Sequence, residues 1–432
     1  MKYILVLSLF LSLVSVYGME LGDTPYVVLF LGMSLIVGGY LIKFFQGRSI
    51  GFRLNFSIKD FSPVDKFLSS TLIWLWLLII VSWLIGVLIG LVNGVDPSLV
   101  FRNFFGLVVY IIFPVMLIVS PSLRSLIIMI FLAGIVQMCY GFERSYWLII
   151  NPVAFFNIKS SFSELRSFYN TGFIVIFPLF MVGVAYQLLL KHYFPNNYGQ
   201  MVTRLSKSLI FTLLTLIALV VPAMSKAYIL ATTILFLSVV FFSISYLIKT
   251  GRLHKNIVLL VFLVVLLLYL LPSSFYEVII HSYSSQEGSN SIKIEQFGYL
   301  VSELTFFGNG LGSSLSSGYV RDARGYGFEL TYMNIVHKLG VFSIFLFSSY
   351  VITLMVASIR IVRRVYVFES LFVIGLMGYL VVGAGNPILL SISAVILHCV
   401  AMYILVKPFL RPLKENHDNW GKVIHNNEVL TI

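Results

Sequence analysis

Long apolar runs recur from one end of the chain to the other, and they restrict its possible folds more than any other feature. A bilayer core requires about 20 predominantly apolar residues in each spanning helix. Only 11% of the 432 residues are charged and the mean hydropathy is +0.98, whereas soluble domains carry roughly 25% charged residues. The sequence therefore predicts an all-α polytopic membrane protein, with a single transmembrane domain over residues 1–432.

About twelve segments are long and apolar enough to be transmembrane helices, namely residues 3–18, 25–45, 67–92, 99–119, 123–140, 171–190, 207–224, 227–248, 256–272, 329–359, 367–383 and 386–406. They are continuously apolar and lack the alternation of β-barrel strands. The first segment follows Lys2 and ends near Gly18, so it is either a cleaved signal peptide or a retained helix. We favour a retained helix, because the next segment follows after a very short loop.

Basic residues are concentrated in alternate connections between these segments. Those connections, the N-terminus and the C-terminal tail hold 20 of the 29 lysine and arginine residues. The positive-inside tendency predicts that both termini are cytoplasmic, including the tail at residues 407–432. Because the net charge of +12 is then mostly a matter of topology, we expect no nucleic-acid partner.

Nine basic residues fall on the predicted outer side, against this tendency: Arg102, Arg144, Lys159, Arg166, Lys226, Lys293, Arg321, Arg324 and Lys338. Cations at such positions usually face a water-filled cavity or a partner charge. The alternative is that each long side chain reaches the lipid headgroups. Their concentration in a few connections favours the cavity.

The one large outer connection of this topology, residues 273–328, lies between the ninth and tenth segments. Residues 291–307 carry apolar side chains at helical spacing, with Lys293, Gln296 and Glu303 on a different side, which predicts an amphipathic helix on the membrane surface. The glycine-rich run at residues 308–312 has backbone N–H groups that could meet an anion. We expect the helix to act as a mobile cover, with these glycines as its hinge.

The start of the tenth segment places Glu329, Tyr332 and His337 on one face, whereas Lys338 points the opposite way. His337 lies roughly 12 Å deeper along the helix axis than Glu329. This face predicts a polar cavity for an anionic substrate such as a pyrophosphate. The alternative is that Glu329 caps the helix N-terminus and pairs with an arginine. Histidines and cysteines show no metal-ligand spacing, so we expect neither a metal nor another cofactor.

Several short motifs resemble, in order, those of the O-antigen polymerase (Wzy) family, within the O-antigen ligase and polymerase superfamily. They are SIKIEQF at residues 291–297, FGNGLG at 307–312, Arg321, ELTY at 329–332, KLG at 338–340 and the pair Asn386-Pro387. The turn at residues 224–227 is similar to the family's Ser-Arg-Gly/Ala turn, with Lys226 in place of the commoner arginine. The order of motifs and spans is similar across nearly the whole chain and implies a GT-C-like fold.

The resemblance implies glycosyl transfer between undecaprenyl-pyrophosphate-linked oligosaccharides, at the periplasmic face of the bacterial inner membrane. A sugar hydroxyl attacks an anomeric carbon and lipid pyrophosphate leaves, so a carboxylate base and fixed cations are needed. Glu329 and Arg321 are the candidate catalytic residues; the candidate substrate-binding residues are Arg102, Arg166, Lys226, Lys293, Arg324, Tyr332 and His337. The resemblance also implies membrane lipid and a chain-length regulator protein as partners.

Two other functions stay open at this point. An O-antigen ligase would transfer finished glycan to a lipid or protein acceptor, but ligases usually have a histidine where this chain has Glu329. A flippase or transporter of lipid-linked oligosaccharides would also have many helices and a cationic cavity. Alternating access does not require a large outer loop, and the two halves show no internal repeat of the kind that transporters often have.

Overall fold

The computed structural model describes residues 1–14, 24–45, 52–54, 61–103, 105–150, 172–188, 200–220, 225–250, 288–319 and 328–412. Within these ranges the regular structure is helical except for two strands of three residues each. Six helices are long and apolar enough to cross a membrane, and a seventh span is present if the pair at residues 200–220, bent by 79°, is counted as one. The predicted span at residues 256–272 lies outside the described residues.

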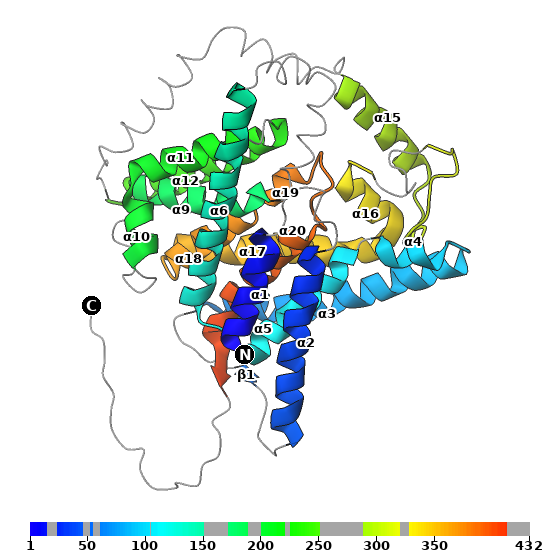
Figure 1. Ribbon diagram of the computed structural model, residues 1–432, viewed down its shortest axis with the longest axis horizontal. Coiled ribbons are helices and arrows are strands. Elements are labelled where there is room, and N and C mark those ends of the chain that lie inside the picture. The colour runs from blue at the N-terminus through cyan, green and yellow to red at the C-terminus, as the bar shows by residue number, and fades with distance from the viewer. Residues whose placement is uncertain are drawn as a thin grey trace.

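The helices follow the apolar segments in order (Figure 1). They are α1 (Lys2–Val14), α2 (Thr24–Phe45), α3 (Pro63–Val92), α4 (Pro97–Arg102), η2 (Phe105–Ile111), α5 (Ile112–Val119), α6 (Leu123–Ile150), η3 (Phe173–Ile176), α9 (Phe177–Leu188), α10 (Gln200–Lys207), α11 (Leu209–Val220), α12 (Lys226–Thr250), α15 (Gly288–Ser302), α16 (Thr331–Leu339), η6 (Gly340–Phe342), α17 (Ser343–Arg363), α18 (Val367–Leu376), α19 (Tyr379–Val382), α20 (Ile392–Val406) and η7 (Lys407–Phe409).

Local sequence explains where several helices begin. The Ser62 hydroxyl accepts a hydrogen bond from the Asp65 amide at 3.0 Å and Pro63 opens α3, a pattern typical of a helix N-terminus. Ser391 caps α20 in the same way, accepting from the Ala394 amide at 3.3 Å. The helix predicted from residue 386 therefore begins later, at Ile392.

Helix α20 forms the centre of the molecule, since every residue from Ile392 to Val406 is buried. Figure 1 shows α9 to α12 on one side of the molecule and α15 and α16 on the other. Helix α3 packs along α17, and α1 packs against α2 and α6. The remaining apolar faces are exposed, as lipid-facing surfaces require.

The predicted span at residues 329–359 is broken near its start. Gly340 has φ +52, and a Cβ there would lie 2.3 Å from the backbone nitrogen of Gly308. The chain forms the short 3-10 helix η6 at this point before α17 continues. The close approach of residue 308 therefore requires glycine at position 340.

The connections between the helices meet in two groups that correspond to the two predicted sides of the membrane. Strands β1 (Phe52–Leu54) and β2 (Leu410–Pro412) pair antiparallel, and the Tyr403 hydroxyl donates to the Pro121 carbonyl at 2.7 Å. In the other group, the Asn93 side-chain amide donates to the Asn309 carbonyl at 3.1 Å. Connections predicted to share a side are therefore in contact.

Candidate functional site

Helix α15 presents three polar residues to the starts of α12 and α16. Asn290, Lys293 and Gln296 are spaced by three residues, so they follow one face of the helix. The Gln296 carbonyl oxygen accepts a hydrogen bond from the Leu330 amide at 3.0 Å. Residues Ile294 and Phe297 point outward and are 61% and 49% exposed. The polar side of α15 thus faces the protein and the apolar side faces outward.

The candidate base Glu329 pairs with Lys293. Their closest atoms, Lys293 Nζ and Glu329 Oε2, lie 3.7 Å apart, and the two side chains are 26% and 24% exposed. Gly385 lies beside Lys293, because a Cβ added there would be 3.5 Å from Nζ. The absence of a side chain at position 385 leaves room next to the ammonium group. The ion pair is thus accessible from outside the protein.

A second cation, Lys226, approaches the same helix. Its Nζ donates to Asn290 Oδ1 at 3.5 Å, and it is the first residue of α12. Asn290 and Lys293 are three positions apart, which is about 4.5 Å along a helix axis. Two ammonium groups and one carboxylate from α12, α15 and the start of α16 are therefore gathered at one end of the molecule. We call Lys226, Lys293 and Glu329 the outer cluster.

Hydrogen bonds fix the start of α16 beside this cluster. The Thr331 hydroxyl donates to the Asn386 carbonyl at 2.8 Å, and the Tyr332 hydroxyl donates to the Leu380 carbonyl at 2.8 Å. Tyr332 therefore joins α16 to α19. The cap residue Leu330 makes no side-chain cap bond, and Glu329 pairs with Lys293 of α15. Glu329 thus forms an ion pair just before the N-terminus of α16.

The helix face that holds His337 was predicted to line a polar cavity, but His337 has a different environment. It is fully buried, and its Nε2 accepts from Asn309 Nδ2 at 2.9 Å. The same amide group donates to the Glu303 carbonyl at 2.8 Å. His337 therefore fixes the glycine-rich run and lies two helical turns from the outer cluster.

Lys338, the next residue after His337, is also fully buried. Its Nζ donates to the Ser313 carbonyl and to the Ser313 hydroxyl, and lies 5.4 Å from the centre of the Phe328 ring. A buried ammonium group is stable only when it has such partners. This outer cation therefore has a structural role.

The glycine-rich run is packed tightly between α3 and α16. The Leu311 amide donates to the Gly86 carbonyl at 2.9 Å, and the Gly310 amide donates to the Lys338 carbonyl at 3.0 Å. Glycines 308, 310 and 312 all have φ between +77 and +82. A Cβ at Gly310 would lie 2.3 Å from the Gly90 nitrogen. These glycines permit close packing, which is a different role from the hinge that we expected, and the amides of Gly310 and Leu311 already have protein partners.

The carboxylate of Glu303 holds the segment that follows. It accepts from the Ser316 amide and hydroxyl, both at 2.9 Å, and from the Ser317 amide at 3.3 Å. Partial burial acts to raise the pKa of Glu303, but these hydrogen bonds outweigh it and lower the pKa below its usual value. Glu303 is therefore a charged anchor for residues 316–317.

The other candidates lie apart from the cluster or outside the described residues. Arg102 is the exposed last residue of α4, and the next residue, Asn103, accepts from the Gly312 amide at 3.1 Å. Arg166, Arg321 and Arg324 lie outside the described part of the chain. The structure therefore brings together Lys226, Lys293 and Glu329, with Tyr332 alongside. The sequence pattern placed Gln296 with Lys293 on the polar side of this helix, whereas Asn290 was missed, although its spacing from Lys293 marks the same face.

The fold and the cluster define a helical membrane protein with a charged, accessible site at one end. Within the described ranges, no group of three or more His, Cys, Asp or Glu side chains could hold a metal ion. Comparison of the chain with protein-family profiles, curated proteins and solved structures found no match.

Proposed function

We propose that this chain is a membrane glycosyltransferase that joins undecaprenyl-pyrophosphate-linked repeat units, an O-antigen-type polymerase. The observation that carries the proposal is the outer cluster, in which the carboxylate of Glu329 lies 3.7 Å from Lys293 while Lys226 contacts the same helix. A carboxylate suits the activation of a sugar hydroxyl, and fixed cations suit a departing pyrophosphate.

In the proposed reaction, a sugar hydroxyl of one repeat unit transfers its proton to Glu329 and its oxygen bonds to the anomeric carbon of the second. The bond between that carbon and the pyrophosphate oxygen breaks, and the lipid pyrophosphate leaves with the electron pair. Lys226 and Lys293 neutralise this charge. Lys293 would exchange its contact with Glu329 for one with pyrophosphate, which leaves the carboxylate free to accept the proton.

The wider arrangement that we propose is the one the sequence predicts. Twelve spans in a GT-C-like fold lie in the bacterial inner membrane, with both termini cytoplasmic and the outer cluster facing the periplasm. The two separate groups of connections support this topology. The outward apolar side of α15 suits contact with a lipid-linked substrate, because exposed Ile294 and Phe297 would rest among lipid chains.

The chemical test is Glu329→Gln, with Glu295→Gln as the control. Glu295 is an exposed residue of α15 outside the cluster, so its substitution makes the same change of charge away from the proposed site. Loss of a general base lowers the rate by on the order of 10²–10⁴, and we expect Glu329→Gln to show this loss while Glu295→Gln stays active. Chain extension would be followed on purified protein with lipid-linked repeat units, at several pH values and with folding checked. An active Glu329→Gln enzyme with an unaltered pH profile would exclude Glu329 as the base.

The class of reaction is tested by deleting the gene. A polymerase predicts that single repeat units are still transferred to the final acceptor, whereas loss of a ligase leaves the acceptor without any repeat unit. Accumulation of repeat units on the cytoplasmic leaflet would instead indicate a flippase. Either of the last two outcomes contradicts the proposal.

A further inference from the structure

A pocket whose lining includes charged, hydroxyl and apolar groups lies at the other end of the molecule, where α1, the turn between α5 and α6 and the end of α20 meet. Its volume is about 460 Å³. Lys2 and Lys407 line it from opposite ends of the chain, together with Ser120 and Ser122 of the turn and Ser125 in the first turn of α6. Two ammonium groups and three hydroxyl groups therefore line one space. The described residues that line the pocket include no acidic side chain.

Contacts within the protein hold one of the two cations in place. Lys407 Nζ donates to the Ser120 hydroxyl and lies 5.6 Å from the centre of the Tyr403 ring. The Tyr403 hydroxyl in turn donates to the Pro121 carbonyl at 2.7 Å, which joins the turn to α20. Lys407 is partly buried, and the like charge of Lys2 acts on it. An anion between the two ammonium groups would replace this repulsion by attraction.

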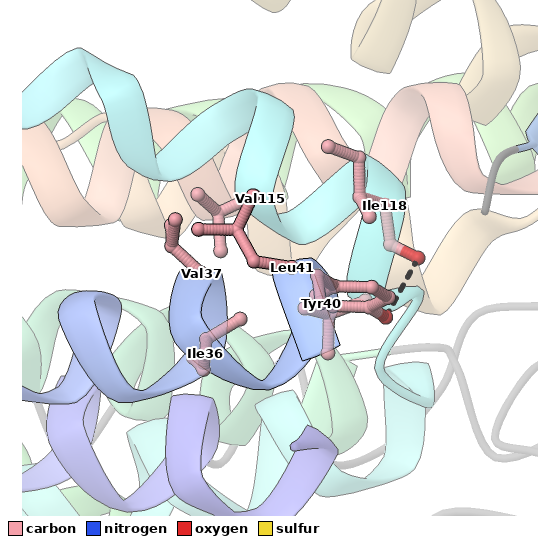
Figure 2. A pocket seen from close by; sticks show the side chains of 7 residues that line it. Ile36, Val37, Tyr40, Leu41, Val115 and Ile118 are labelled. Carbon is pink, nitrogen blue, oxygen red and sulfur yellow. Dashed lines mark hydrogen bonds between the residues drawn. The ribbon is translucent and has the colours of Figure 1, made fainter. Parts of the chain in front are cut away.

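An apolar groove is shown in Figure 2. It lies between α2 and α5, has a volume of about 320 Å³, and is lined by Ile36, Val37, Tyr40, Leu41, Val115, Ile118 and Val119. Val37 and Leu41 are 50% and 51% exposed, so the groove opens to the surroundings of the protein. The Tyr40 hydroxyl donates to the Ile118 carbonyl at 3.4 Å, as the dashed line in Figure 2 shows.

The groove and the pocket are adjacent, because Val119 lines the groove and the next residue, Ser120, lines the pocket. The side chain of Met1 also lies against α2, since a Cβ added at Gly39 would be 2.4 Å from its Cε. We propose that pocket and groove together bind one anionic phospholipid, with its phosphate between Lys2 and Lys407 and an acyl chain between α2 and α5.

We propose a phospholipid because a pocket with two cations lies next to an apolar groove. Lysine ammonium and serine hydroxyl groups are suitable donors to phosphate oxygens. Basic pockets beside membrane helices recognise anionic headgroups in this way. Inorganic phosphate would fill the pocket but would have no contact with the groove. Tyr3, 86% exposed at the pocket, is of the type enriched at the level of the lipid headgroups.

The test measures phosphatidylglycerol retained by the purified full-length chain after transfer into phosphatidylcholine nanodiscs. We expect the wild type to retain one molecule of phosphatidylglycerol. The double variant Lys2→Gln/Lys407→Gln should retain about tenfold less, because both phosphate contacts are lost. Val115→Trp should also reduce retention, because the indole ring fills the groove and leaves the cations unchanged.

The control is Arg204→Gln/Lys207→Gln, which removes two exposed cations of α10 and makes an equal change in net charge. This control should retain the lipid, with thermal unfolding compared for all three variants. Equal retention by the pocket variant and the control would overturn the proposal. Displacement of the lipid by inorganic phosphate, together with normal retention by Val115→Trp, would also overturn it, because the site would then bind free phosphate.

Discussion

The carboxylates of Glu303 and Glu329 have different partners and hence different roles. Glu329 forms an ion pair with Lys293, in which Oε2 and Nζ lie 3.7 Å apart and the two side chains are 24% and 26% exposed. Glu303 accepts three hydrogen bonds from a single short segment, two of them from backbone amides. Glu303 is therefore suited to hold the loop in shape, and Glu329 is suited to chemistry.

We predict that Glu303→Gln destabilises the segment around residues 316–317 at neutral pH but not in acid. The pKa of Glu303 is lowered by the Ser316 and Ser317 donors, against the effect of partial burial. Its contribution is therefore fully present above the usual glutamate pKa of 4.5 and is lost as the pH falls through the lower folded-state value.

The measurement is proteolysis of the loop in wild type and variant, from neutral pH to below the glutamate range. Faster cleavage of the variant at neutral pH should converge with the wild type in acid. Glu295→Gln is again the matched control, because Glu295 is exposed on α15, the helix that ends one residue before Glu303. A difference that persists unchanged into acid would contradict the role given to the Glu303 carboxylate.

Single residues also show which side-chain environments could be predicted from the sequence and which could not. Glu329 pairs with Lys293, and the Tyr332 hydroxyl donates to the Leu380 carbonyl. Helical spacing placed His337 in the cavity, but spacing along one helix cannot show what covers that helix. Asn309, 28 residues earlier, bonds to the imidazole and buries it.

At the scale of elements, the glycine-rich run is the feature whose interpretation changed most. Glycine spacing alone does not distinguish a hinge from a close contact between backbones. The Leu311 amide donates to the Gly86 carbonyl of α3, and Gly310 lies against Gly90. Such contacts depend on residues over 200 positions apart, which no local pattern reveals. The apolar side of α15, in contrast, follows directly from its sequence.

We predict that Gly310→Ala destabilises the protein by about 2–5 kcal/mol, because of its left-handed backbone and because its new Cβ has no room. The φ angle is +82, and the Cβ would lie 2.3 Å from the Gly90 nitrogen. The matched control is Gly298→Ala in α15, where an added Cβ meets nothing within 4 Å. The control should stabilise the helix by up to about 1 kcal/mol. Unfolding of both variants in the same detergent provides the comparison, and equal stability would disprove the packing role of Gly310.

At the scale of the whole molecule, one buried ion pair joins three distant parts of the chain. Arg360 of α17 donates to Asp65 of α3, with Nη2 and Oδ1 3.0 Å apart, and to the Leu405 carbonyl of α20 at 2.8 Å. Both side chains are almost fully buried, at 1% and 3% exposed. The aromatic rings of Phe61 and Phe409 lie 5.0 Å and 5.8 Å from the guanidinium carbon.

From the charge pattern of the sequence, Arg360 was assigned to a predicted cytoplasmic connection, together with Arg363 and Arg364. The sequence pattern locates Arg360 near the end of a helix, but it cannot show that the carboxylate of Asp65, on another helix, lies beside it. Asp65 and Arg360 are 295 positions apart. The apolar runs thus predicted the helices, whereas the contacts that fix the helices against one another came only from the structure.

The last prediction concerns this pair, because removal of one partner leaves a buried charge without compensation. Asp65→Asn should destabilise the folded protein by about 3–5 kcal/mol. The double change Asp65→Leu/Arg360→Met should be much milder than Asp65→Asn, since it removes both charges and fills the space with apolar side chains. Arg363→Met is the matched control, because Arg363 is exposed and lies three residues further along α17. Denaturant unfolding of the three proteins in lipid nanodiscs measures the differences. If Asp65→Asn were as stable as Arg363→Met, the pair would not hold α3, α17 and α20 together.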